Sequence, residues 1–135
     1  MTIRIVRLGS PRHPEEGLRI GTVRRPPRGV RREHFARDDW FDVWLPVLAP
    51  TQEDVKLALA ARSDGDWRRF AQGYRRHMDR PDARHLLELL AALSRTTNFA
   101  VGCYCENPAR CHRSLLGQLF ERLGADVVSV NPDVP

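Results

Sequence analysis

The segment from Phe99 to Phe120 constrains the fold more than any other, because it reads as a strand, a tight loop and a helix in direct succession. Phe99 to Cys103 is a short apolar run, which is typical of a buried strand. Strands that alternate with helices are typical of α/β proteins. The helix is indicated by apolar residues that recur at helical spacing: Leu115, Leu116, Leu119, Phe120 and Leu123.

Strand and helix patterns alternate through the rest of the sequence as well. The length of 135 residues is usual for one domain with one core. We therefore predict a single α/β domain over residues 1–135, with three compact layers and a mostly parallel central sheet flanked by helices. Further strands are expected over 3–8, 18–23 and 126–130, and helices over 51–63, 66–80 and 82–95.

The balance of charge is basic, with 22 Lys and Arg against 17 Asp and Glu, and this favours attraction to polyanions. A nucleic acid is therefore one candidate partner. Lys56 is the single lysine, however, and a GC-rich genome produces such an arginine bias through codon composition alone. The most apolar run, Leu86 to Leu93, carries a glutamate and is shorter than the ~20 residues that cross a bilayer. We expect a cytoplasmic protein with no membrane partner.

The loop after the predicted strand gathers the reactive side chains. Cys103, Cys105 and Cys111 are all the cysteines of the chain, and His112 follows them directly. Three thiols in one loop suit thiol, metal or core roles better than a disulfide framework. A helix that starts near Cys111 lowers the pKa of a neighbouring thiol, so Cys105 and Cys111 are candidate nucleophiles or redox thiols. His112 is the candidate proton donor or acceptor.

The same helix start favours an anion, because its free backbone N–H groups and its dipole present positive charge. Arg110, Arg113 and Ser114 strengthen this preference and are the candidate anion ligands here. The alternative for Arg113 is an ion pair with Glu106 or Glu121, because an arginine fork suits carboxylates as well as phosphates.

A second cationic loop follows the strand predicted over 18–23. It holds five arginines within residues 24–32, where two prolines and a glycine exclude regular structure. Arg25 and Arg28 are candidate ligands of a phosphate, since guanidinium groups bind phosphate oxygens in a bidentate manner. The alternative is a solvated arginine-rich loop.

The spacing of the cysteine loop departs from two familiar patterns. A cysteine-dependent phosphatase places its arginine one residue further from the cysteine than Arg110 lies from Cys105. Zinc sites usually draw ligand pairs from two separated segments, with about two to four residues inside a pair, unlike the run from Cys103 to His112. We therefore predict no metal ligand and no cofactor. The alternative role for each cysteine is that of a small buried hydrophobe.

The strand followed by Cys105-Glu-x-Pro-x-x-Cys-His-Arg-Ser and an apolar helix resembles the bacterial and archaeal family known as domain of unknown function 488. Pro26 stands where that family commonly has a tryptophan. The resemblance implies a compact three-layer α/β fold and brings no settled activity with it. It extends over most of the chain, to Arg25-Pro-Pro-Arg28-Gly-Val, Trp40 with Leu48-Ala-Pro-Thr51, and Trp67 with Phe70 and Tyr74.

These observations favour a protein that binds a phosphate-bearing small molecule where the loop of Arg25 and Arg28 meets the helix start at Cys111. Two other functions stay open. One is a module that binds nucleic acid through its arginine-rich loops, and the other is a thiol-dependent enzyme or redox sensor at Cys105 and Cys111. The sequence decides neither whether the protein is an enzyme nor its oligomeric state.

Overall fold

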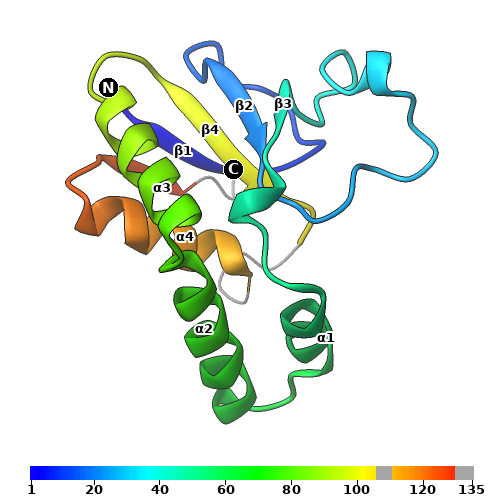
Figure 1. The fold of residues 1–135 in the computed structure, drawn as a ribbon. Coiled ribbons are helices and arrows are strands. Elements are labelled where there is room, and N and C mark those ends of the chain that lie inside the picture. The colour runs from blue at the N-terminus through cyan, green and yellow to red at the C-terminus, as the bar shows by residue number, and fades with distance from the viewer. Residues whose placement is uncertain (106–110, 130–135) are drawn as a thin grey trace.

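The computed structural model describes residues 1–105 and 111–129, and within them five strands form one sheet (Figure 1). Every neighbouring pair of these strands runs parallel. The α/β class and the parallel sheet predicted from the sequence are therefore confirmed. In the order β3-β2-β4-β1-β5, the strands are β1 (Ile3–Arg7), β2 (Leu18–Gly21), β3 (Val43–Trp44), β4 (Phe99–Cys103) and β5 (Val127–Ser129).

The central strand is β4, which lies between β1 and β2 although both precede it in the chain by many residues. All 5 of its residues are buried, as expected of a parallel strand that is covered on both faces. Cys103 lies opposite Arg7 of β1, and Gly102 lies opposite Gly21 of β2. The three central strands therefore end together at one edge of the sheet.

The capping residues predicted from the sequence were tested at two helix starts, and one of the two is confirmed. Thr51 caps the first helix by accepting a 3.1 Å hydrogen bond from the Asp54 amide. The second helix begins earlier than predicted, because Ser63 rather than Asp66 is the cap and accepts from the Asp66 amide over 3.2 Å. No helix in residues 1–105 and 111–129 has the length and apolarity needed to cross a membrane. The helices are α1 (Gln52–Ala60), α2 (Asp64–Met78), α3 (Pro81–Leu93) and α4 (His112–Arg122), with short 3-10 turns at η1 (Arg32–His34) and η2 (Pro46–Leu48).

The main core lies between one face of the sheet and helices α2, α3 and α4, while α1 packs on α2 (Figure 1). The aromatic stripe predicted for α2 is buried there through Phe70 and Tyr74. The Tyr74 hydroxyl donates to the Leu48 carbonyl over 2.8 Å, so its polar atom has a partner inside the core. The sheet and α4 contribute Ile3, Ile5, Ile20, Phe99, Val101, Leu115, Leu116 and Phe120.

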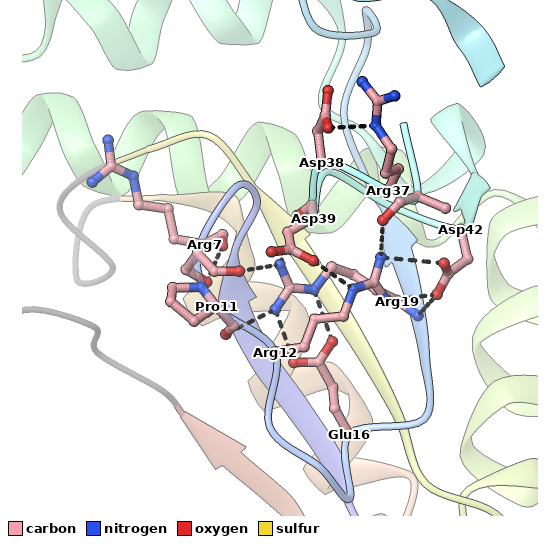
Figure 2. A network of polar contacts seen from close by, with 11 residues as sticks. Arg7, Pro11, Arg12, Glu16, Arg19, Arg37, Asp38, Asp39 and Asp42 are labelled. Atoms are coloured by element: carbon pink, nitrogen blue, oxygen red, sulfur yellow. Dashed lines mark hydrogen bonds and ion pairs between the residues drawn. The ribbon is translucent and has the colours of Figure 1, made fainter. Parts of the chain in front are cut away.

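Loops cover the other face of the sheet in the described part of the chain. Phe41 packs over β2 so closely that a Cβ added at Gly21 would lie 2.5 Å from its ring. Arg19 points to the same side, because it is two residues from Gly21 in the strand. It is fully buried and forms an ion pair with the buried Glu16 (Figure 2). The three layers are therefore helices, sheet and a layer of loops.

Candidate functional site

The carboxyl ends of β1, β2 and β4 meet at one edge of the sheet, which is where α/β proteins bind ligands. A cleft of about 1320 Å³ opens there. Segments that follow the three strands form most of its lining, and α1, Trp40, Pro50 and the first residue of α4, His112, contribute the rest. The functional side chains in the lining are the cationic Arg7, Arg24, Arg25, Arg28 and Lys56, the aromatic Trp40, Tyr104 and His112, and the thiols of Cys103 and Cys105.

The arginine-rich loop after β2 forms one wall of the cleft. The Tyr104 hydroxyl donates to the Arg25 carbonyl over 2.9 Å and so fastens this loop to the end of β4. Arg24 is held through its side chain, whose Nη2 donates to the Pro50 carbonyl over 2.9 Å. Arg25 and Arg28 are exposed, and within the described residues their guanidinium groups have no hydrogen-bond or ion-pair partner. These two groups are therefore free to contact a ligand.

Helix α4 begins beside the cleft and lines it through His112. Cys111 is the N-cap residue in an extended conformation, and its side chain makes no capping hydrogen bond. Ser114 uses its hydroxyl inside the first turn, where it donates to the Cys111 carbonyl over 2.8 Å. The Ser114 side chain thus stabilises the first turn of the helix and does not line the cleft.

Arg113 is buried beside Cys105, with only 1 % of its surface exposed. Its Nη2 donates to the Cys105 carbonyl over 2.7 Å. Its Nε and Nη1 are buried and have no hydrogen-bond partner in the described part of the chain. Such orphaned donors are rare, because burial removes their water without replacing it. Arg113 forms no pair with Glu121, and Glu106, the other partner considered, lies outside the described residues.

The three cysteines differ in exposure and in charge. Cys103 and Cys111 are buried with their sulfur atoms 2.6 Å apart, whereas Cys105 is exposed. Hydrogen bonds from Cys103 and then Cys111 lower the pKa of the Cys105 thiol, and the Arg113 cation adds to this. Hydrogen bonding to Cys105 raises the pKa of Cys103 to about 12, and hydrogen bonding to Cys103 also raises the pKa of Cys111. Of the three thiols, Cys105 is therefore the one that loses its proton most readily.

His112 is buried at the base of the cleft. Its Nε2 lies 2.7 Å from the Thr22 carbonyl oxygen, which can only accept a hydrogen bond. Nε2 therefore carries the ring proton, and Nδ1 keeps a lone pair. Nδ1 lies 3.7 Å from the sulfur of Cys111. Burial lowers the pKa of His112 to about 4, so the imidazole is neutral near pH 7.

The structure brings the two loops selected from the sequence into one cleft, although 79 positions separate Arg25 from Tyr104. Four of the selected residues line this cleft, namely Arg25, Arg28, Cys105 and His112. Three others do not line it, since Cys111 and Arg113 are buried and Ser114 is in the first turn of α4. Arg110 falls outside the described residues.

Sequence reasoning missed several residues that line the cleft. Arg7 ends β1 and Tyr104 follows β4, so the strand-end rule that located Cys105 applies to both and could have found them. Lys56 reaches the cleft from α1. No signal in the sequence pointed to Lys56, because the packing of α1 on α2 decides where it lies.

The comparison with protein families finds a match over residues 3–124, which include β1 to β4 and all four helices of the described part. The matching family is described as the active DUF488-N3 subclade. No curated protein and no solved structure matches the chain. The matched residues include the cleft and the whole strand–loop–helix segment on which the resemblance rested. The chain belongs to the DUF488 family, in its active DUF488-N3 subclade.

Proposed function

We propose that the cleft at the ends of β1, β2 and β4 binds an organic phosphate. The observation that carries the proposal is the charge of the lining, which contains five cationic side chains and, among the described residues, no carboxylate. A concave surface of one charge concentrates ligands of the opposite charge. Phosphate fits because arginine binds its oxygens in a bidentate manner.

Arg25 and Arg28 are the side chains best placed to hold the phosphate. Both are exposed in the cleft wall, and neither guanidinium is engaged by another described residue. The Tyr104 hydroxyl already holds the backbone of Arg25. A loop that is ordered before the ligand arrives loses less entropy on binding, which favours affinity.

Arg113 supports an anion in the cleft from behind the lining, beside Cys105. Its guanidinium is buried next to Cys105, and two of its nitrogens lack partners among the described residues. A buried cation acts through a lower dielectric than an exposed one, so its attraction for an anion is stronger at the same distance. The phosphate and the Cys105 thiolate are the two negative groups that this charge favours.

Trp40 and Tyr104 favour an organic phosphate over inorganic phosphate. Both rings line the cleft and meet edge to face, with their centroids 5.9 Å apart at an angle of 75°. Aromatic side chains in cationic grooves stack on planar groups such as nucleobases. The proposed ligand therefore carries a planar group beside its phosphate, as a nucleotide does.

Isothermal titration calorimetry with a nucleoside monophosphate and the matching nucleoside tests the proposal. The nucleotide should bind more tightly than the nucleoside, because only the nucleotide reaches the arginines. Replacing both Arg25 and Arg28 by Gln should weaken nucleotide binding at least tenfold, or about 1.4 kcal/mol. Replacing Arg68 and Arg69 by Gln on the exposed side of α2 removes the same charge away from the cleft and should leave affinity unchanged.

Two results would contradict this function. One is the absence of nucleotide binding at millimolar concentration, and the other is an equal loss of affinity in both double variants. Tight binding of an oligonucleotide that weakens steeply with salt and exceeds nucleotide binding would favour the nucleic-acid-binding module instead.

A second candidate function is thiol chemistry at Cys105. Its position favours it, because it is the exposed cysteine of the three and lines the cleft. The subclade is described as active, which agrees with catalysis. Brief treatment with iodoacetamide followed by peptide mass mapping should modify Cys105 well before Cys103 and Cys111. Equal modification of all three cysteines would count against a selective reactive thiol.

A further inference from the structure

The geometry points to a binding site for a thiophilic divalent metal ion, of the zinc class, formed by Cys103, Cys111 and His112. One ligand atom from each residue lies within 4.8 Å of the others, and all three residues are buried. Spacing along the chain argued against a metal. The fold changes this picture, because Cys103 ends β4 whereas Cys111 and His112 begin α4.

Two sulfurs and an imidazole nitrogen are donors that zinc prefers. Cys111 Sγ and His112 Nδ1 are 3.7 Å apart, close to the ~3.6 Å that tetrahedral zinc bond lengths set between sulfur and nitrogen. The sulfurs of Cys103 and Cys111 are 2.6 Å apart, and a tetrahedral zinc would hold them at roughly 3.8 Å. Metal binding therefore separates the two sulfurs by about an ångström and leaves the nitrogen in place.

His112 is already oriented as a ligand. Its Nε2 donates to the Thr22 carbonyl over 2.7 Å, which leaves the lone pair of Nδ1 on the side of Cys111. Histidines that bind metals usually donate their second ring N–H to a carbonyl or carboxylate, and that contact fixes the tautomer and the ring angle. The Thr22 carbonyl provides this support before any ion binds.

The donor set also balances the charge of the ion. Both thiols lose their protons to solvent when the metal binds, so two thiolates, a neutral imidazole and a divalent cation sum to zero. A neutral unit suits a buried position, where an unpaired charge would be costly. Binding should therefore release about two protons for each metal ion.

Among the described residues the site has three ligands, and two of them, Cys103 and His112, contribute to the cleft lining. We assign the fourth coordination position to solvent or to a ligand in the cleft. Cys105 is exposed and lies outside the group of three ligands. Three protein ligands with one open position is the arrangement of catalytic zinc sites, whereas structural sites are closed by a fourth residue.

Cobalt(II) titration of the full chain, reduced and stripped with a chelator, tests the site. We expect one equivalent to bind with the d–d and thiolate charge-transfer absorption of a tetrahedral site, and zinc to displace it. Cys103→Ser, Cys111→Ser and His112→Gln should each weaken cobalt binding at least tenfold. His85→Gln is the matched control for His112→Gln, because it makes the same change on the exposed side of α3, and it should bind one equivalent as the wild type does.

The site would be overturned if the reduced wild-type protein took up neither cobalt nor zinc, or if His85→Gln lost binding as severely as His112→Gln. Native mass spectrometry of the wild type is a second measurement that needs no variant to fold. It should show the mass of one zinc ion less two hydrogens. A metal-free mass lower by two hydrogens under reducing conditions would indicate a disulfide between Cys103 and Cys111 and would also overturn the site. Because the site does not depend on a phosphate, its failure leaves the nucleotide titration unaffected.

Discussion

His112 Nε2 donates to the Thr22 carbonyl over 2.7 Å, and this bond joins the first residue of α4 to the residue that follows β2. The two residues are 90 positions apart in the chain. Thr22 directly precedes the arginine-rich loop and His112 lines the cleft, so this contact, together with that of Tyr104 and Arg25, holds the loop against the cysteine-bearing segment. An imidazolium would keep the Nε2–H that this contact uses, so protonation of the ring would occur at Nδ1.

Lowering the pH should reduce the free energy of unfolding of the metal-free protein, because His112 becomes protonated on unfolding. Its pKa is about 4 in the folded chain, below the ordinary value near 6.5, so folding opposes its protonation. The free energy of unfolding should be fully retained above about pH 6.5 and should fall towards pH 4, by an amount on the order of 3 kcal/mol. Urea unfolding at a series of pH values measures this. His112→Gln keeps a donor but cannot titrate, and it should lack this part of the slope; equal slopes would contradict the prediction.

Neutralising Glu16 should destabilise the fold strongly. The side chains of Arg19 and Glu16 are 0 % and 2 % exposed. They form an ion pair in which Arg19 Nε lies 2.8 Å from Glu16 Oε2 (Figure 2). Glu16→Gln leaves the guanidinium buried without its counter-ion, and removal of one partner of a buried pair costs about 3–5 kcal/mol. Chemical denaturation monitored by circular dichroism gives the change.

The exposed pair of Arg37 and Asp38 supplies the control for this experiment. Its side chains are 66 % and 42 % exposed, so Asp38→Asn should change stability by no more than about 0.5 kcal/mol. A similar cost for Glu16→Gln and Asp38→Asn would show that burial does not set the strength of the inner pair.

Gly17→Ala should cost far more than Gly29→Ala, although both glycines have positive φ angles, of 76° and 72°. A Cβ at Gly29 meets nothing within 4 Å, so only the backbone strain of about 1 kcal/mol remains. A Cβ at Gly17 would lie 2.1 Å from the Asn98 carbonyl oxygen, which belongs to the backbone before β4. We expect a loss of at least about 3 kcal/mol there. Thermal unfolding of the two variants compares them directly, and equal costs would exclude the steric explanation.

Asp42→Asn should destabilise the protein at neutral pH and much less in acid. Burial works against ionisation of Asp42, but hydrogen bonds from Arg12 and from the Arg19 amide outweigh it and lower its pKa. The stability that the carboxylate provides is therefore present above about pH 4 and is lost as the pH falls through the lower folded value. We expect a loss of about 1–2 kcal/mol at pH 7. A difference between variant and wild type that stays constant down to pH 2 would contradict the assignment.

Local patterns were sufficient for the elements that carry the site. The apolar run of Phe99 to Cys103 is β4. The helical spacing of the apolar residues from Leu115 to Leu123 predicted the helix that the structure shows at His112–Arg122. These predictions succeed because side-chain periodicity along a strand or helix depends on residues that are close in the sequence. Thr51 as a cap is confirmed for the same reason.

Long-range packing decided the roles of single charged residues. Arg19 and Arg113 have the same side chain as the exposed Arg25 and Arg28, yet both are buried. The residues near Arg19 in the sequence do not predict its burial, because the burial depends on a distant loop. That loop contains Phe41 and Asp42 and covers this face of the sheet. The basic composition therefore overstates how many cations are free to meet a polyanion.

The sequence by itself determined the α/β class, the family and the segment that carries the functional residues, because these follow from short periodic patterns and a local motif. Only the tertiary structure placed β4 between β1 and β2 and so brought the arginine-rich loop to the cysteines. It also placed Cys103 beside Cys111 and His112, although the spacing of these residues along the chain had argued against a metal site. The physical reason is that strand order and burial are set by the packing of the whole chain, whereas spacing records only the path between residues.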